Sequence, residues 1–247
     1  MTKEFAGQVA VVTGAGRGLG KAVARLLHAR GGHVIIVDLD KEAAEAASVD
    51  ISGKGHGVSV ACLDAGNEEE LVALRERIGA EHGHLDILIN NAGGWRYGRA
   101  HEISLSDWDW TFRTNVTVPF LTTRVLMELM TARRYGRVVN VASTDAYRAK
   151  PTLPHYAAAK AAVVSLTKSF GEELARHQVL VNAVSPGPIA TETAREQGWL
   201  EERAKLVPLG RVAEPEDIAE VILFLASPRN RFIVGETIIA NGGILMA

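Results

Sequence analysis

The feature that most constrains the fold is an alternation of short apolar, β-branched runs with longer segments of helical periodicity. The runs are apolar almost throughout, as strands covered on both faces should be. We predict strands at residues 9–13, 34–38, 58–63, 87–90, 138–141, 179–184 and 237–240, and helices at 19–29, 67–83, 106–134, 155–176 and 215–226. Pro119 is expected to kink or break the third of these helices. The alternation predicts an α/β fold with a doubly wound parallel sheet and helices on both faces.

We expect one domain spanning residues 1–247, because no internal repeat, low-complexity tract or Pro/Ser-rich linker interrupts the chain. Three longer segments lack clear periodicity, at residues 92–105, 143–154 and 186–210, and each follows a predicted strand. Ligands of open α/β sheets bind outside the carboxyl ends of the strands. The three segments are therefore predicted to form the substrate loops of a site.

Composition excludes several classes of function. The net charge of −2 is too balanced for a nucleic-acid or acidic-membrane binder, and no run approaches the ~20 apolar residues of a membrane span. The single cysteine, Cys62, allows no disulfide within the chain, which fits a reducing compartment. No metal is expected, because the histidines show no ligand spacing with cysteine or carboxylates. We expect a soluble cytoplasmic protein that binds neither nucleic acid nor membrane.

A glycine-rich turn follows the first predicted strand and leads directly into the first predicted helix. Its sequence runs from Thr13 to Gly20, with glycines at positions 14, 16, 18 and 20. Glycine lets the backbone turn tightly and approach a pyrophosphate, and a helix N-terminus supplies free N–H groups. In this context the turn predicts a Rossmann-type dinucleotide site, the alternative being a purely structural tight turn.

An acidic residue, Asp38, ends the second predicted strand, 18 residues after Gly20. In the dinucleotide fold an acid about 20 residues on hydrogen-bonds the adenosine ribose. It would also repel a 2′-phosphate, so NAD is favoured over NADP. Arg17 could act in the opposite sense by binding a phosphate, whereas residue 39 is Leu rather than a basic residue. The alternative is that Asp38 only caps a loop.

Four further features indicate where the chemistry takes place. Tyr156 and Lys160 stand four residues apart in a predicted helix and so share one face. Ser143 follows the fifth predicted strand. The sequence Asn-Asn-Ala-Gly at 90–93 ends the fourth, and Asn115 occupies a helix interior, where asparagine is unfavourable.

Together these motifs resemble the short-chain dehydrogenase/reductase family, from Val9 to Gly243 and in the family's order and spacing. The resemblance implies a catalytic set of Asn115, Ser143, Tyr156 and Lys160. It implies cofactor contacts at Gly14, Arg17, Gly18, Leu19, Gly20, Asp38, Leu39, Asp64, Ala65, Asn91, Ala92, Gly93, Tyr156, Lys160, Pro186, Gly187, Ile189 and Thr191. Family members are usually dimers or tetramers, so a homotetramer or homodimer is expected, paired through the helices that begin near Ser106 and His155.

The resemblance also implies a role for each catalytic residue. Tyr156 would be the general acid/base, Ser143 would orient the substrate oxygen, and Lys160 would bind the nicotinamide ribose and lower the pKa of Tyr156. Asn115 would anchor a water that links Lys160 to solvent. An ammonium ~4 Å from the phenol, at an effective dielectric of ~20, contributes about 4 kcal/mol, or roughly 3 pKa units. We therefore expect Tyr156 to titrate near the working pH, as general acid–base catalysis requires.

The substrate is less closely defined. An apolar pocket beside Ser143 and Tyr156 is expected, which favours a secondary alcohol or ketone with an apolar body. The residues expected to line it are Trp95, Tyr97, Tyr147, Leu153, Ile189 and Trp199. Arg96, Arg99 and Arg148 could bind an anionic substrate, although a solvated loop face is the simpler interpretation.

Three alternatives stay open. A 3-oxoacyl carrier-protein reductase would use NADPH and a basic docking patch, for which Arg133, Arg134 and Arg137 are candidates. A methyltransferase could share the glycine turn and the acid but would have no use for Tyr156 and Lys160. A non-catalytic NAD(H)-binding regulatory protein could share the fold.

Overall fold

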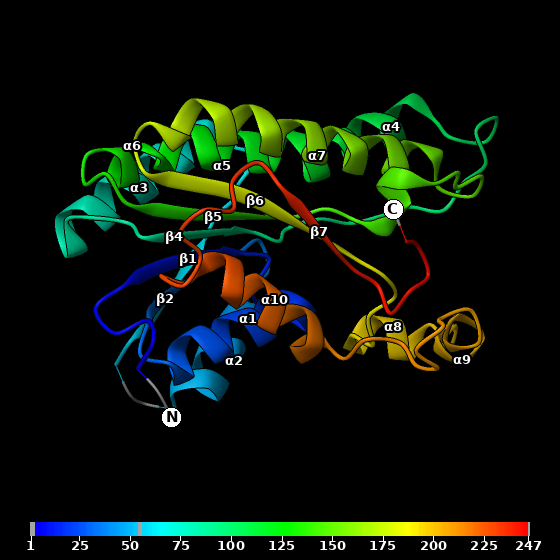
Figure 1. The fold of residues 1–247 in the computed structure, drawn as a ribbon, viewed down its shortest axis with the longest axis horizontal. Coiled ribbons are helices and arrows are strands. Elements are labelled where there is room, and N and C mark those ends of the chain that lie inside the picture. Colours follow the sequence, from blue (N-terminus) through cyan, green and yellow to red (C-terminus); the bar gives the residue numbers. More distant parts are fainter. Residues whose placement is uncertain (1–2, 54–55, 247) are drawn as a thin grey trace.

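The computed structural model describes residues 3–53 and 56–246, which form a central parallel sheet between two layers of helices (Figure 1). Its strands run in the order β3-β2-β1-β4-β5-β6-β7. They are β1 (Val9–Thr13), β2 (His33–Asp38), β3 (Val58–Cys62), β4 (Ile87–Asn90), β5 (Gly136–Val141), β6 (Val179–Pro186) and β7 (Thr237–Ala240). The strand order reverses between β1 and β4, which is where a doubly wound sheet opens a crevice for ligands. The predicted fold class is confirmed.

Helices cover both faces of the sheet. One layer holds α3 (Glu68–His82), α4 (Leu105–Phe112), α5 (Val118–Leu126), α6 (Glu128–Thr131) and α7 (Pro154–Ala175). The other holds α1 (Gly18–Ala29), α2 (Lys41–Ser52) and α10 (Pro215–Ala226). Two short helices, α8 (Glu192–Glu196) and α9 (Leu200–Ala204), lie beyond the carboxyl end of β6.

The strands are apolar throughout because each contributes to two cores. Val12 and Ile36 belong to the core under α1 and α10, whereas Val11 and Ile35 belong to the core under α3 and α5. Successive side chains of a strand point to opposite faces, so neighbouring residues must both be apolar. Full burial of each such side chain contributes about 1.5–3 kcal/mol.

One helix, α2, was not predicted. Its apolar face is narrow, since only Ala44 and Ala47 are buried. Hydrophobic periodicity is therefore weak there. The available signal was at its start, where the side chain of Asp40 accepts a hydrogen bond from the N–H of Ala43 and caps the helix.

The long helix predicted at 106–134 is interrupted, as its proline suggested, but the break precedes the proline. A π-helical turn, η1 (Arg113–Thr117), separates α4 from α5, and Pro119 lies in the first turn of α5. Proline is tolerated there because the first N–H groups of a helix have no partner within it.

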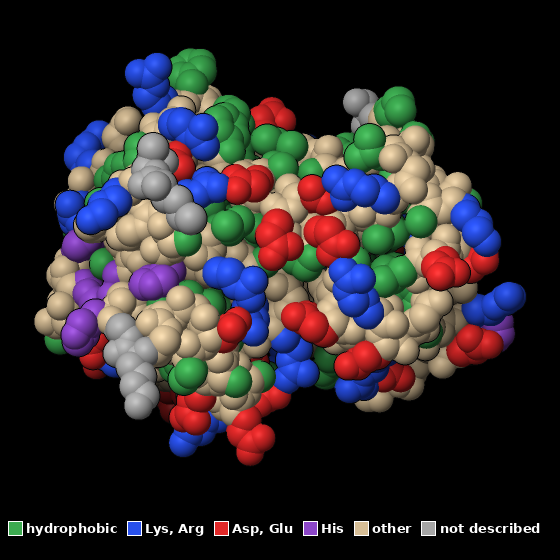
Figure 2. Space-filling model, turned by 90° about the horizontal axis from the view of Figure 1, so that it is seen from below, with side chains coloured by type: hydrophobic (Ala, Val, Ile, Leu, Met, Phe, Trp, Pro, Cys, Tyr) green, Lys and Arg blue, Asp and Glu red, His purple; other side chains and the backbone are tan. Residues whose placement is uncertain are grey.

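The face that carries α1 and α10 shows positive and negative side chains interspersed, with histidines gathered at one end (Figure 2). Among residues 3–53 and 56–246, no helix is long and apolar enough to cross a membrane. Within the same ranges, no group of three or more His, Cys, Asp or Glu side chains could hold a metal ion.

Candidate active site

A cavity of about 550 Å³ opens at the carboxyl ends of the central strands and is lined by all three predicted substrate loops. Most predicted site residues border it. They are Gly14, Arg17, Gly18, Leu19, Asn91, Gly93, Trp95, Asn115, Ser143, Leu153, Tyr156, Lys160, Pro186, Gly187, Ile189, Thr191 and Trp199. Six predicted cofactor contacts lie outside its lining, and these are Gly20, Asp38, Leu39, Asp64, Ala65 and Ala92. Asp38 is the last residue of β2, Leu39 follows it, and Asp64 and Ala65 follow β3.

The glycine turn admits no side chain at two of its positions. Gly14 has a φ of +62°, and a Cβ there would lie 2.9 Å from the Cα of Ala92. A Cβ on Gly20 would lie 2.5 Å from the Asn91 Nδ2 atom and would also strike the Gly14 carbonyl oxygen. Glycine is therefore required by the contact of the turn with the end of β4.

Asn91 and Thr13 join that turn to β4. The Asn91 Nδ2 atom donates to the carbonyl oxygens of Thr13 and Gly14, both at 3.0 Å. The Thr13 Oγ1 atom accepts from the N–H groups of Asn91 and Ala92, at 3.1 and 3.0 Å. The side chain of Asn91 thus fixes the glycine turn against the end of β4.

Asp38 faces the glycine turn from the end of β2. Its Oδ2 atom accepts from the N–H of Gly16 at 2.9 Å, and its Oδ1 atom accepts from the N–H of Asp40 at 3.1 Å. The Arg17 guanidinium forms an ion pair with Asp40. Arg17, the only basic residue of the turn, is therefore paired with Asp40, two residues after Asp38, which is expected to bind the ribose.

Asp64, the residue that resembles the family's adenine contact, is held by two donors. Its Oδ1 atom accepts from the N–H of Gly66 at 2.7 Å, and its Oδ2 atom accepts from Arg113 at 2.8 Å. Desolvation alone would raise the pKa of Asp64, but these two donors bring it below its ordinary value. Of the predicted cofactor contacts next to Asp38 and Asp64 in the chain, Leu39 is exposed and Ala65 is buried.

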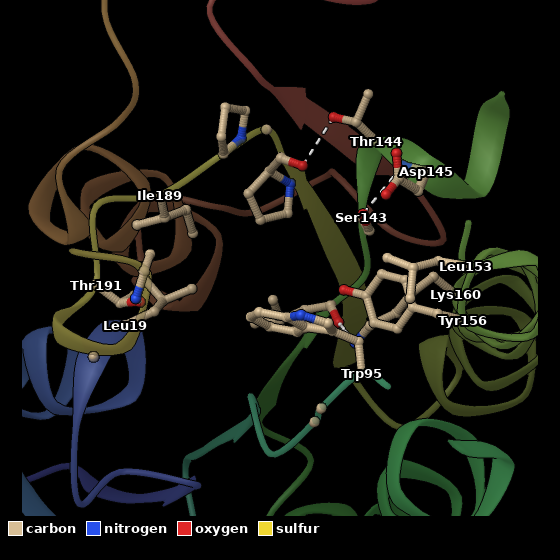
Figure 3. Close-up of a pocket in the computed structure, with 18 of the residues that line it drawn as sticks. Leu19, Trp95, Ser143, Thr144, Asp145, Leu153, Tyr156, Lys160, Ile189 and Thr191 are labelled. Atoms are coloured by element: carbon tan, nitrogen blue, oxygen red, sulfur yellow. Dashed lines mark hydrogen bonds between the residues drawn. The ribbon is translucent and has the colours of Figure 1, made fainter. Parts of the chain in front are cut away.

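Ser143, Tyr156 and Lys160 meet at the other end of the cavity (Figure 3). Ser143 follows β5, whereas the other two lie one turn apart on α7. Lys160 is 4% exposed, and its Nζ atom donates to the carbonyl oxygen of Val141 at 2.8 Å. The ammonium lies over the Tyr156 ring, 5.7 Å from its centre.

The prediction of a lowered Tyr156 pKa is wrong for this structure. Burial is the largest influence and raises the pKa of Tyr156 above its ordinary value, while the hydrogen bond with Ser143 lowers it and the Asp145 charge raises it. Burial also lowers the pKa of Lys160 to about 8. Burial thus outweighs the hydrogen bond from Ser143, and the pKa of Tyr156 lies above its ordinary value.

Asn115 lies in the π-helical turn and is 1% exposed. Its Oδ1 atom accepts from the N–H of Gly94 at 3.3 Å, and its Nδ2 atom donates to the carbonyl oxygens of Gly94 and Thr111 at 2.8 and 2.9 Å. The unfavourable asparagine thus joins the interrupted helix to the segment after β4. A Cβ on Gly93 would lie 2.9 Å from the Asn115 Oδ1 atom, so this packing is close.

Five of the six apolar residues predicted for the substrate pocket line the cavity, and Tyr147 does not. The Trp95 ring centre lies 6.3 Å from that of Tyr156, edge to face, and Leu153 and Trp199 also line the wall. Tyr147 ends the short 3₁₀ helix η2 (Thr144–Tyr147) outside the cavity lining, with its side chain exposed. The turn of η2 removes Tyr147 from the wall, a change of direction that the sequence pattern did not indicate.

Several cavity residues were not predicted. Trp110, Lys150, Glu192, Arg203 and Leu206 all border the cavity. Four of them lie inside the predicted substrate loops, namely Lys150, Glu192, Arg203 and Leu206. The sequence identified these loops but not which of their side chains point into the cavity. Trp110 lies on α4, where a helical pattern suggested core packing.

The glycine turn fits the phosphates of a dinucleotide. The N–H of Gly18, at the start of α1, donates to the Glu192 Oε2 atom at 3.1 Å. A carboxylate thus stands where an anion is expected, at a helix N-terminus. Gly14 and Gly18 would lie against the phosphates of a bound nicotinamide dinucleotide, and Tyr156, Lys160 and Thr191 would contact its nicotinamide half.

The basic patch considered for a carrier protein does not form as predicted. Arg137 is 6% exposed, and its guanidinium donates to the carbonyl oxygens of Gly136 and Asn230 at 2.8 and 2.9 Å. Because β5 is a central strand, this side chain is enclosed. Only Arg133 and Arg134 of the three are exposed.

Known proteins match this chain over nearly its whole length. A family model described as enoyl-(acyl carrier protein) reductase matches residues 14–245. The 3-oxoacyl-(acyl-carrier-protein) reductase of Vibrio cholerae is 38% identical over 97% of this chain and 98% of its own. A hydroxy(phenyl)methylsuccinyl-CoA dehydrogenase subunit of Thauera aromatica is 35% identical over 96% of both chains. A short-chain type dehydrogenase/reductase from Mycobacterium marinum has a TM-score of 0.93 at 30% identity, covering 99% of this chain and 98% of its own.

The chain therefore belongs to the short-chain dehydrogenase/reductase family. It is an oxidoreductase that acts on hydroxyl and keto groups, and its family uses a nicotinamide cofactor. The methyltransferase interpretation is excluded by this membership.

Proposed function

We propose that this protein reduces a 3-oxoacyl group, carried as a thioester, to the 3-hydroxyacyl group with NADH. This substrate is one form of the ketone with an apolar body that the sequence favours. The supporting observation is the cavity in which Ser143, Tyr156 and Lys160 stand opposite the glycine turn. Relatives named for oxoacyl-carrier and acyl-CoA substrates support the choice of ketone.

Each side chain has a role in this reaction. A bound reduced nicotinamide supplies the hydride to the keto carbon. Tyr156 donates its phenolic proton to the keto oxygen, and Ser143 holds that oxygen by a hydrogen bond. Lys160, fixed by the Val141 carbonyl, keeps its ammonium beside the ring and stabilises the phenolate left behind.

The pKa of Tyr156 favours the reductive direction. A general acid must hold its proton until the substrate oxygen gains charge, and burial keeps the phenol protonated at neutral pH. Oxidation of the alcohol would need the phenolate at the start, so it should require a higher pH.

The choice of NADH follows from the charges around Asp38. A 2′-phosphate at the end of β2 would lie among Asp38 and Asp40, and such like-charge juxtaposition costs several kcal/mol. Arg17 is already paired with Asp40, so binding a 2′-phosphate would require it to leave that partner. The carrier-protein reductase interpretation implies NADPH, whereas the charges around Asp38 favour NADH.

The test is a parallel fluorescence titration with NADH and NADPH, followed by turnover of a 3-oxohexanoyl thioester. We expect NADH to bind at least about tenfold more tightly, and Asp38→Ala to reduce that preference at least about tenfold. Tighter NADPH binding by the wild type would overturn the cofactor assignment. Absence of turnover with either cofactor would overturn the reductase assignment and favour the non-catalytic interpretation.

A further inference from the structure

Three cationic side chains and one carboxylate lie at the substrate side of the cavity. Arg148 and Lys150 follow η2, and Arg203 comes from α9; all three border the cavity. The Arg148 Nε atom lies 2.9 Å from Asp145 Oδ1, and the Lys150 Nζ atom lies 3.4 Å from Asp145 Oδ2. We call Arg148, Lys150 and Arg203 the basic cluster.

The basic cluster keeps an excess of positive charge. Asp145 is shared by Arg148 and Lys150, and among residues 3–53 and 56–246 no carboxylate lies within ion-pair distance of Arg203. The Lys150 side chain is only 14% exposed. Burial lowers the pKa of Lys150, Asp145 opposes this, and the charges of Arg203 and Arg148 lower it further, so these cations lie close enough to repel one another. An anion between them would relieve that repulsion.

The surroundings of the basic cluster indicate the kind of anion. Trp199 and Leu206 flank Arg203 in the chain and line the same cavity, and Leu153 follows Lys150 within it. The cluster lies on the substrate loops, whereas the cofactor phosphates have their own place at the N-terminus of α1. A ligand that meets both surfaces carries an apolar chain and a negatively charged group.

We propose that the basic cluster binds an oxyanion on the substrate itself, namely the phosphate of a thiol carrier or a carboxylate of the acyl group. This inference rests on the proposed reductase function. Arg148 and Lys150 approach the oxyanion from the segment after β5, and Arg203 approaches it from the segment after β6. Binding would therefore draw the loop at 186–210 towards the loop at 143–154.

The test compares substrates that differ by one phosphate. 3-Oxohexanoyl-4′-phosphopantetheine and 3-oxohexanoyl-pantetheine are reduced by the wild type and by Arg203→Gln and Arg148→Gln, with saturating NADH and with free 3-oxohexanoate as a third substrate. We expect each variant to lower kcat/KM at least about tenfold, through KM, for the substrate that carries the recognised anion. The phosphate-free thioester should change less than about twofold. Loss confined to the phosphorylated ester identifies the phosphate, and loss confined to the free acid identifies a carboxylate.

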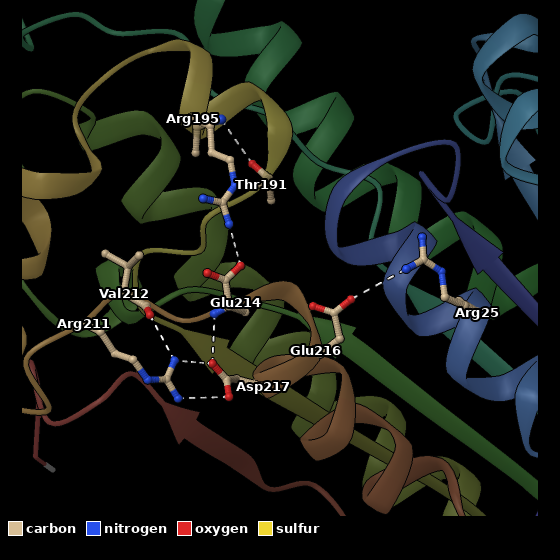
Figure 4. Close-up of polar contacts among 9 residues, drawn as sticks. Arg25, Thr191, Arg195, Arg211, Val212, Glu214, Glu216 and Asp217 are labelled. Atoms are coloured by element: carbon tan, nitrogen blue, oxygen red, sulfur yellow. Dashed lines mark hydrogen bonds and ion pairs between the residues drawn. The ribbon is translucent and has the colours of Figure 1, made fainter. Parts of the chain in front are cut away.

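Arg195→Gln is the matched control. Arg195 lies on α8 of the same segment but pairs with Glu214 at 2.6 Å, outside the cavity lining (Figure 4). This variant should leave all three kcat/KM values unchanged. Equal changes in all three substrates for Arg203→Gln, or no change in any, would overturn the proposal while the reductase function stands.

A failure of the reductase function is distinguishable. If no substrate is reduced, binding of 3-hydroxyhexanoyl-4′-phosphopantetheine and of its phosphate-free counterpart is followed by tryptophan fluorescence, since Trp95, Trp110 and Trp199 line the cavity. Saturating NADH occupies the cofactor site in this measurement. Tighter binding of the phosphorylated compound that Arg203→Gln abolishes supports the basic cluster, and equal Kd values overturn it.

Discussion

The cofactor side and the substrate side of this cavity are built by different means. On the cofactor side, backbone atoms make the critical contacts, as where Asn91 holds the carbonyl oxygens of Thr13 and Gly14. On the substrate side, side chains from distant segments meet, as where Lys150 and Arg203 approach one another. Close backbone packing demands particular residues in a short stretch and leaves a motif. Juxtaposed side chains leave none, because each is an ordinary loop residue in its own segment.

The two sides also treat charge differently. Near the glycine turn, Arg17 is paired with Asp40 and Asp38 accepts two backbone N–H groups. In the basic cluster, Asp145 pairs with Arg148 and Lys150, while Arg203 has no carboxylate within ion-pair distance among residues 3–53 and 56–246. Near the glycine turn the charged groups are paired within the protein. In the basic cluster, positive charge is left over, and we propose that an anionic ligand balances it. The following variants test this contrast.

Tyr156→Phe should have the largest effect, because it removes the proton donor from the chemical end. We expect kcat to fall about 10²–10⁴-fold. NADH affinity should change little, since the ring and the glycine turn remain. Steady-state kinetics measures kcat, and a fluorescence titration measures the affinity for NADH. Retention of most of kcat would show that Tyr156 is not the general acid.

Gly20→Ala should destabilise the cofactor side by about 3 kcal/mol or more, because its Cβ would strike the Gly14 carbonyl oxygen and the Asn91 side chain. Urea unfolding measures this loss. Gly79→Ala on α3 is the control, since its Cβ would lie 3.7 Å from the nearest atom, in Leu129, and it should stabilise by about 0.4–1 kcal/mol. Equal stability of the two variants would contradict the close packing of the turn.

Lys160→Met should change how stability depends on pH. Burial lowers the pKa of Lys160 from 10.5 to about 8, so between these values the folded protein binds fewer protons than the unfolded chain. The free energy of unfolding of the wild type should therefore rise by about 3 kcal/mol from pH 8 to 10.5, relative to the variant. The free energies of unfolding are measured with urea at the two pH values. The same change with pH in the wild type and the variant would show that Lys160 is not desolvated.

Glu192→Gln should have the smallest effect. The Glu192 carboxylate accepts from the Gly18 N–H, where a cofactor phosphate is expected, and so competes with it. Removing the charge should tighten NADH binding about two- to fivefold, measured by fluorescence titration. Weaker binding by the variant would mean that Glu192 supports the bound cofactor.

The sequence predicted the strands of the sheet closely, because burial on both faces makes each strand a continuous apolar run. It missed α2, since a helix that buries only two alanines shows little periodicity. The wrong expectation for the Tyr156 pKa has another cause. The spacing of Tyr156 and Lys160 indicates that they share a helix face. Their pKa values also depend on desolvation, which is set by all the residues packed around them.

The parallel fold and the glycine turn could be predicted from the sequence, because they depend on local backbone geometry and short spacings that the order of residues records directly. The Ser143, Tyr156 and Lys160 set was predicted through the family resemblance of the motifs. Three outcomes could be read from the folded structure alone: Tyr147 lies outside the cavity lining, Arg137 is enclosed, and Arg203 borders the same cavity as Arg148 and Lys150. Those outcomes depend on the directions in which loops leave the sheet, and a loop's direction is set by contacts with residues far away in the chain.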